Sequence, residues 1–186
     1  NSGTLQYARI EFSSQTYSTD TASAGLFLAA VGNGTTIDHV QVHRVADDGV
    51  ELQGGNVRTS NVVVTGVEDD SFDFDSGWSG SAQYLILQQY PNVGDHAIEA
   101  DGDSFDVIDP SNPLLANLTI VGNDGTDDSV RIRQDAAPAI YNSIVANAGQ
   151  FSITEDASDD PAGSVTYAGV VVANADGIVA AVDLAE

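Results

Sequence analysis

The sequence predicts an all-β chain that folds as a right-handed parallel β-helix, a solenoid of about seven turns. Three observations predict this fold: a two-strand phrase recurs at a fixed period, apolar and polar residues alternate within each phrase, and no helical pattern of useful length is present. A unit this short cannot bury its own apolar side. Neighbouring units must therefore stack on one another to form a continuous core.

The period is clearest between residues 36 and 75. Here 36–42 followed by 47–52 matches 59–64 followed by 69–74, and each half is an alternating strand joined to the next by an acidic turn. Equivalent residues are 22 positions apart, as in Val40 and Val62 (62 − 40 = 22) or Val50 and Phe72 (72 − 50 = 22). The spacing predicts that these pairs lie side by side in adjacent turns.

Five less regular copies extend the pattern along the chain: 8–12 with 24–28, 83–87 with 95–100, 116–120 with 127–132, 142–145 with 149–153, and 168–172 with 176–180. The apolar residue after each turn is expected to form one interior column: Leu26, Val50, Phe72, Ile98, Val130, Phe151 and Ile178. Steps along this column range from 21 (151 − 130) to 32 (130 − 98) residues. A solenoid accepts such variation because loops leave and rejoin the same turn.

Composition limits the classes of partner. The chain has 186 residues, no Cys, no Lys, 5 basic side chains and 28 acidic ones, for a formal net charge of -23. This surface repels nucleic acid and anionic lipid and suits divalent cations. No apolar run reaches the roughly 18 residues of a membrane span, so no membrane insertion is expected. We expect one domain over 1–186, a processed form or fragment of a longer secreted or cell-surface protein, because Met is absent.

The phrases GTTIDHVQVHRVADDGVELQGG, NVVVTGVEDDSFDFDSGW and GDHAIEADG resemble a family of bacterial extracellular right-handed parallel β-helix proteins of the pectate-lyase-like superfamily. The resemblance is strongest from residue 34 to 101 and looser after 114. It implies the fold and an extracellular setting. It implies no particular reaction, because that family has no assigned activity and fold does not define function.

Stacked turns would place acidic residues about 4.8 Å apart. Carboxylates this close either share a cation or take up protons, and Ca²⁺ accepts six to eight oxygen ligands in flexible geometry. The predicted ligands are Asp48, Glu51, Asp70, Asp73, Asp75, Glu99, Asp101 and Asp103. The alternative is a solvated acidic face that salt screens. The spacing matches neither an EF-hand loop nor the nonapeptide Ca²⁺ repeat.

Other polar and aromatic residues carry weaker expectations. Trp78 and Tyr90 lie near the acidic turns and predict a sugar-binding groove, in which rings stack on sugar faces; alternatively, Trp78 closes a corner of the core. One corner column is expected to hold a hydrogen-bonded ladder of side chains: His39, Asn61, Tyr84, Asn117 and Asn142. His43 and His96 have no consistent partner in the pattern and are expected to be ordinary.

The favoured function is a non-catalytic module that binds Ca²⁺ and neutral glycans. One alternative is a polysaccharide hydrolase that uses Asp48, Asp70 and Asp73, with carboxyl groups roughly 6.5–9.5 Å apart. Residues 130–133 resemble the basic motif of polygalacturonases, but no Gly-His-Gly accompanies them. A lyase would need a Lys or Arg base and a cationic subsite, which this charge disfavours. A further alternative is a subunit that associates with itself end to end.

Overall fold

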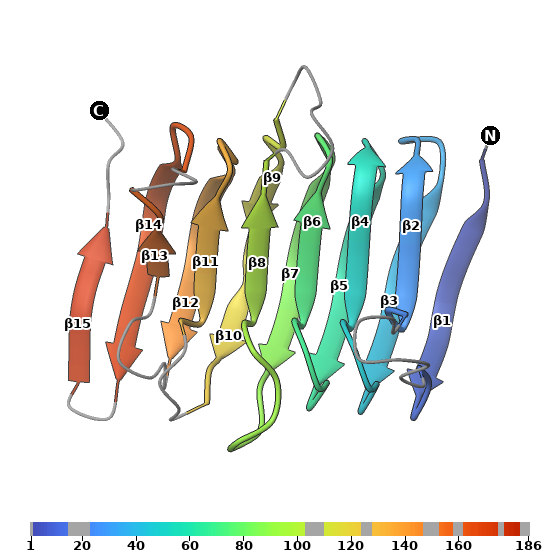
Figure 1. The fold of residues 1–186 in the computed structure, drawn as a ribbon, viewed down its shortest axis with the longest axis horizontal. Helices are drawn as coiled ribbons and strands as arrows, with labels where there is room; N and C mark the ends of the chain where they lie inside the picture. Colours follow the sequence, from blue (N-terminus) through green and yellow to red (C-terminus); the bar gives the residue numbers. More distant parts are fainter. Residues whose placement is uncertain are drawn as a thin grey trace.

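A computed structural model describes residues 2–14, 23–102, 110–123, 128–146, 153–157, 162–174 and 177–182. Within these ranges the chain forms two sheets that face each other along a common long axis (Figure 1). The secondary structure they contain is strand and turn, without helix, and none of it could cross a membrane as a helix. The strands β1 and β15 lie at opposite ends of the long axis (Figure 1).

The two sheets take alternate strands of the chain. The nine-stranded sheet contains β1 (Thr4–Glu11), β3 (Thr36–His43), β5 (Arg58–Thr65), β7 (Ser81–Gln88), β9 (Leu114–Ala116), β10 (Thr119–Val121), β12 (Ala139–Ala146), β14 (Thr166–Asn174) and β15 (Gly177–Val182). The six-stranded sheet contains β2 (Leu26–Val31), β4 (Val50–Gly55), β6 (Phe72–Asp75), β8 (Ile98–Asp101), β11 (Val130–Arg133) and β13 (Ile153–Glu155). Each turn of the solenoid thus contributes to both sheets.

The predicted register is confirmed. Val40 pairs with Val62, and Val50 pairs with Phe72, both in parallel strands. The interior column continues through Leu26 on one side and through Ile98 and Val130 on the other. The predicted parallel β-solenoid is therefore confirmed. It has about five turns, whereas the repeats in the sequence predict about seven.

The C-terminal copies differ from the prediction. The residue that pairs with Val130 is Ile153, two positions after the predicted Phe151, which lies outside the described residues. The last expected strand does not add a turn, because β15 folds back and pairs antiparallel with β14, with Ile178 opposite Ala173. Ile178 is therefore not part of the interior column. Short apolar strands rich in Val and Ala are compatible with either pairing, so the pattern alone could not distinguish a further turn from a hairpin.

The core is a continuous stack of aliphatic side chains with an aromatic cluster near its middle. Trp78 has no exposed surface, and its ring centroid lies 5.9 Å from that of Phe72 and 5.3 Å from that of Phe74. Its indole Nε1 donates a hydrogen bond to the Val57 carbonyl at 3.3 Å. A Cβ at Gly80 would come within 2.6 Å of the same nitrogen, so only glycine leaves room for the ring there.

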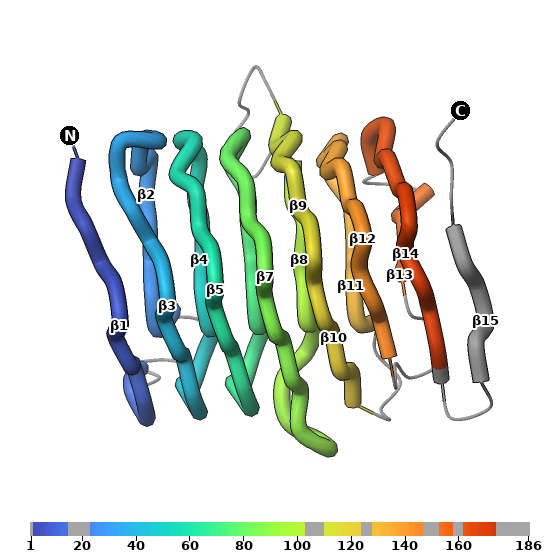
Figure 2. The backbone as a smooth tube through the Cα atoms, turned by 180° about the vertical axis from the view of Figure 1, so that it is seen from behind, coloured from blue at the N-terminus to red at the C-terminus, as the bar shows by residue number. Residues whose placement is uncertain are grey.

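The strands of the nine-stranded sheet lie side by side along the long axis (Figure 2), and they share a bend. At the bend one residue per turn has a positive φ between 46° and 64°: Tyr7, His39, Asn61, Tyr84, Asn117, Asn142 and Gly169. We call this set the bend column. Asn142 Nδ2 donates to Asn117 Oδ1 at 2.6 Å, which confirms a side-chain hydrogen bond along this column. The column lies within the strands, except at Asn117, which lies between β9 and β10. Asn is frequent in it because Asn tolerates left-handed backbone better than most residues do.

Candidate functional site

An acidic face covers the outer side of the six-stranded sheet where β4, β6 and β8 adjoin. Alternation buries Val50 and Leu52, so Glu51 between them points outward. Register then places Asp73 beside Glu51 and Glu99 beside Asp73, as predicted. The acidic face comprises these outward residues and the acids of the adjoining turns: Asp48, Glu51, Asp70, Asp73, Asp75, Glu99 and Asp101.

The turn before each strand links one coil of the solenoid to the next. The Asp70 amide donates to Asp48 Oδ1 at 3.0 Å, and the His96 amide donates to Asp70 Oδ1 at 2.7 Å. Asp48 and Asp70 are therefore direct neighbours, as the 22-residue spacing predicts. One oxygen of each carboxylate holds the next turn in place. These hydrogen bonds also fix the orientation of the Asp48 and Asp70 side chains, so less side-chain entropy would be lost if the carboxylates bound a ligand.

Three acids converge on the half of the face formed by β4 and β6. Asp48, Glu51 and Asp73 each offer an oxygen, and these atoms lie within 4.8 Å of one another. Gln53 Nε2 donates to Glu51 Oε1 at 2.9 Å and orients that carboxylate. Among the described residues, no Arg or His forms a recorded ion pair with any of the three. We call Asp48, Glu51 and Asp73 the acid-only triad.

The electrostatic consequence is a raised pKa for each of the three carboxyl groups of the triad. Burial, together with the charges of Asp70 and Asp69, raises the pKa of Asp48 to about 9. Burial and the charge of Asp48 raise the pKa of Asp73 well above its ordinary value, and burial raises that of Glu51. Like charges held this close favour the neutral form unless a positive charge enters.

Arginine neutralises the other half of the face. Arg133 Nε and Nη2 donate to the two oxygens of Asp101 at 2.6 and 3.0 Å, and Nη2 also lies 3.2 Å from Glu99 Oε1. Arg131 pairs with Asp156 at 3.2 Å. The sequence motif at residues 130–133 therefore supplies counter-charges to neighbouring turns. Glu99 and Asp101, predicted as metal ligands, already have cationic partners.

His96 has a structural partner that sequence reasoning missed. It occupies the place of Asp48 and Asp70 in the next turn, and its Nδ1 lies 3.0 Å from Asp70 Oδ1. Burial lowers the pKa of His96, but the hydrogen bond with Asp70 and the nearby carboxylates outweigh it and raise that pKa above its ordinary value. Aligning the Asp-His pair at 95–96 with the Asp-Asp pairs of the preceding turns would have indicated this contact.

The remaining predicted site residues are placed as follows. Asp75 is 8% exposed at the end of β6, and its charge acts on Glu51. Asp103 lies outside the described residues. Tyr90 is half-buried, with the Arg44 guanidinium 5.6 Å from its ring centroid, and a glycan contact there stays a prediction. The glycan contact predicted for Trp78 is wrong, because a fully buried ring has no face to offer a sugar.

Asp38 is a second well-organised carboxylate that the sequence did not indicate. Its oxygens accept hydrogen bonds from Gln6, Ser60 and Asn61 at 3.1, 2.8 and 2.8 Å, and His39 Nδ1 lies 2.8 Å away. The hydrogen bond from Asn61, with those of His39, Ser60 and Gln6, holds the pKa of Asp38 below its usual range. This residue lies on the nine-stranded sheet, outside the acidic face.

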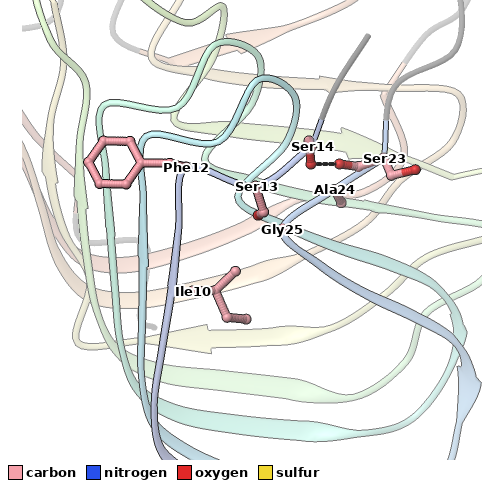
Figure 3. A pocket seen from close by; sticks show the side chains of 7 residues that line it. All are labelled: Ile10, Phe12, Ser13, Ser14, Ser23, Ala24 and Gly25. Atoms are coloured by element: carbon pink, nitrogen blue, oxygen red, sulfur yellow. Dashed lines mark hydrogen bonds between the residues drawn. The ribbon is translucent and has the colours of Figure 1, made fainter. Parts of the chain in front are cut away.

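At least three hollows lie away from the acidic face, among them one of about 360 Å³ beside Asn117, Asn142 and Gly169. Another, of about 370 Å³ beside the first turn, is lined by Ile10, Phe12, Ser13, Ser14, Ser23, Ala24 and Gly25 (Figure 3). The Ser14 hydroxyl donates to the Ser23 carbonyl there, and the Phe12 ring is directed away from the serines (Figure 3). These lining residues include no ionisable side chain, so they offer no acid–base chemistry. A further hollow, of about 350 Å³, adjoins Asp38 and contains Arg58.

Comparison with known proteins supports the fold. A family model described as a pectate-lyase like beta helix domain matches residues 1–180. No curated protein and no solved structure matches the chain closely enough to indicate a relative.

Proposed function

This chain belongs to the pectate-lyase-like β-helix domain family, and we propose that it is an extracellular, non-catalytic module that binds a divalent cation, Ca²⁺, at the acid-only triad. The observation that carries the proposal is the convergence of Asp48, Glu51 and Asp73 within 4.8 Å without a cationic partner among the described residues. A partly buried group of like charges is costly, and a cation would remove that cost.

The donor set of the triad favours Ca²⁺ over Mg²⁺. Calcium accepts six to eight oxygen ligands at 2.3–2.6 Å in flexible geometry, whereas magnesium requires a near-ideal octahedron at 2.0–2.1 Å and gives up its water reluctantly. Three carboxylates from a turn and two strands, all with oxygens within 4.8 Å of one another, suit the ion that tolerates irregular geometry. The three side chains are only partly buried, so water can complete the coordination.

A second group of acids adjoins the triad. Asp47, Asp48 and Asp69 also offer oxygens within 4.8 Å of one another, so Asp48 belongs to both groups. Partial desolvation of the Asp69 carboxyl by its neighbours, with the charge of Asp70, raises the pKa of Asp69 to about 6, although the residue lies at the surface. We assign this group a supporting role, because Asp69 is exposed and its negative charge adds to the field that attracts a cation to the triad. Asp70, Asp95 and His96 form a third group, but His96 already contacts Asp70.

The experiment compares calcium with matched ionic strength. Chelated protein is unfolded thermally with added CaCl₂, with MgCl₂, and with NaCl of equal ionic strength. At a free Ca²⁺ concentration about 100 times Kd, binding stabilises by about 2.7 kcal/mol, which raises Tm by roughly 5–10 °C in a chain of this size. Calcium should exceed both other salts. Equal shifts in all three would leave only screening and overturn the proposal.

Variants locate the site. Glu51→Gln combined with Asp73→Asn removes two ligands and should abolish the calcium-specific shift. Glu68→Gln, which neutralises an exposed acid outside the triad, is the matched control and should leave the shift intact. A calcium response that survives the double variant would assign the ion to another site.

A polysaccharide hydrolase remains the second candidate, and one observation favours it. Hydrolysis needs a carboxyl with a raised pKa, and burial gives Asp73 that property next to acids held by hydrogen bonds. The test is reducing-end release from a panel of plant, algal and bacterial polysaccharides. We expect none. Release that disappears in Asp73→Asn would replace the binding proposal with a catalytic one.

A further inference from the structure

The nine-stranded sheet has no charged residue over most of its length. The strands β7, β9, β10, β12 and β14 contain no Asp, Glu, Arg, Lys or His, although the formal net charge of the chain is -23. In the six-stranded sheet, by contrast, every strand from β4 to β13 contains at least one charged residue. The five uncharged strands lie side by side (Figure 2). We call their solvent-facing side the neutral face.

Large apolar side chains are exposed on the neutral face. Ile86 and Ile144 are each 47% exposed, Leu114 is 48% exposed and Tyr84 is 53% exposed. These are four of the seven large hydrophobic side chains that are exposed among the described residues, so exposure is concentrated on this face. A contiguous apolar surface without charge is typical of a site that another molecule covers, because covering it removes apolar area from water.

One column of outward side chains reads the same in both directions along the solenoid. It begins on β5 and crosses the neutral face, where parallel pairing places Val63, Ile86, Thr119, Ile144 and Val171 side by side in successive turns. Thr119 is at the centre, with an isoleucine on each side and a valine beyond each isoleucine. A two-fold axis that runs parallel to the strands above Thr119 would bring Ile86 opposite the partner's Ile144. This column therefore matches its own reversed copy.

The same two-fold axis places an exposed ring opposite a hollow. In the bend column, Tyr84 lies one turn before Asn117, and Asn142 lies one turn after it. The hollow of about 360 Å³ beside Asn117, Asn142 and Gly169 is on the neutral face. Rotation about the axis brings the partner's Tyr84 opposite Asn142, and so to this hollow. Asn142 Nδ2 donates to Asn117 Oδ1, and the Asn142 amide oxygen can accept a hydrogen bond from a tyrosine hydroxyl.

We infer that the neutral face is the interface of a two-fold symmetric dimer, in which two copies of this chain pack their nine-stranded sheets face to face with antiparallel solenoid axes. The five turns from β5 to β14 span about 24 Å at about 4.8 Å per turn, and a strand of eight residues spans about 26 Å. Two copies would together bury roughly 1,200 Å², and a specific interface needs about 1,000 Å². The area is therefore sufficient for a dimer.

The distribution of charge favours a second copy as the occupant. A basic partner would be attracted to the acidic face, and an anionic partner would be repelled by the formal net charge of -23. Two copies of the chain also repel each other, but contact through the neutral face keeps their acidic faces on opposite sides of the dimer. The inference does not depend on the calcium proposal, because the neutral face and the acid-only triad lie on different sheets.

The test is analytical ultracentrifugation of the chelated protein from about 1 μM to about 1 mM, at low and at high NaCl. We expect a monomer–dimer equilibrium that shifts toward the dimer in high salt, because salt screens the repulsion between the two acidic chains. A monomer at every concentration, or assembly that continues beyond the dimer, would overturn the inference. A monomer that instead binds neutral phosphatidylcholine vesicles would assign the face to lipid and would also overturn it. The calcium experiment can succeed in each case.

Two charged variants locate the interface and its axis. Ile86→Lys and Ile144→Glu each bury an unpaired charge in the dimer and should weaken it at least about tenfold. Mixed in equal amounts, the two variants should form dimers again, because the axis brings position 86 of one copy opposite position 144 of the other. Thermal unfolding of each variant verifies that it is folded, as expected for substitutions of half-exposed side chains.

Phe27→Lys is the matched control. Phe27 is 48% exposed, close to the value for Ile86, but it lies on β2 in the six-stranded sheet. This variant should dimerise like the unmodified protein. Dimers that persist in both isoleucine variants, or that weaken equally in Phe27→Lys, would place the interface elsewhere and overturn the inference. A mixture of the two folded isoleucine variants that stays monomeric would overturn the two-fold arrangement.

Discussion

The two halves of the acidic face are one turn of the solenoid apart, yet only one of them has arginine counter-charges among the described residues. Glu51 and Asp73 face other acids, whereas Glu99, in the same column, lies 3.2 Å from Arg133. Burial raises the pKa of Glu99 to about 7, with the charges of Asp70 and Asp101 in the same direction, while Arg133 and His96 oppose the rise. Asp73 has no comparable cation, and burial together with the charge of Asp48 raises its pKa well above its ordinary value.

The difference teaches how a solenoid distributes charge. Register determines which residues become neighbours, but the identity of the neighbour in the next turn decides whether a carboxylate is stabilised. Arg131 and Arg133 lie on β11, which pairs with β8 on one side and β13 on the other. The arginine side chains therefore pair with the acids of β8, and among the described residues no arginine ion pair involves Asp73 of β6. The acid-only triad is the part of the face that has no cationic partner among the described residues, and this is why the cation is proposed there.

The largest contrast is expected on removing a paired acid. Asp101 is buried and forms two hydrogen bonds with Arg133, so Asp101→Asn should destabilise the protein by about 2–3 kcal/mol. Chemical denaturation in chelator and in calcium should show the same loss, because this half already has its counter-charge. A loss seen only in calcium would mean that Asp101 is a metal ligand, and the division into two halves would fail.

The pH dependence of stability should be set by the acid-only half. A carboxyl with a pKa raised in the folded state stabilises fully below its unfolded pKa and loses that contribution as pH rises through the folded value. For Asp48 this window runs from about 4 to about 9. Chelated protein should thus lose stability across it, by about 1–2 kcal/mol after solvent screening.

Denaturation midpoints at pH 5, 7 and 9 test this slope. Asp48→Asn is the matched variant, because Asn keeps the Oδ1 acceptor for the Asp70 amide but cannot titrate. It should flatten the slope, and saturating calcium should do the same in the unmodified protein. A chelated protein that becomes more stable between pH 5 and 9 would contradict the assignment of raised pKa values to this half.

The smallest effect is expected from Asp73→Asn in chelator. Asn cannot ionise, so the variant avoids both the like-charge repulsion and the proton uptake that Asp73 requires in the folded state; it should stabilise by about 1 kcal/mol at pH 8, with the sign opposite to that of Asp101→Asn. In saturating calcium the same variant should be less stable than the unmodified protein, because it has lost a ligand. Equal destabilisation in both conditions would mean that Asp73 contributes chiefly through packing.

The sequence by itself determined the columns of this protein. Strict alternation assigns Glu51 and Asp73 to one side of their strands, and the 22-residue period makes them neighbours, so the register and half of the acidic face could be predicted. The same logic identified most of the bend column. Both predictions depend only on spacing within and between short repeats.

Only the tertiary structure decided which side chains contact the stacked columns, and at which strand the parallel repeat ends. Trp78 follows β6 in a turn, where alternation no longer indicates a side, and it points into the core beside Phe74. Asp101 and Arg133 are 32 residues apart in the sequence and meet because β11 pairs with β8 after the chain has passed through β9 and β10. The hairpin of β14 and β15 and the four contacts around Asp38 likewise depend on three-dimensional placement, which residue spacing alone does not encode.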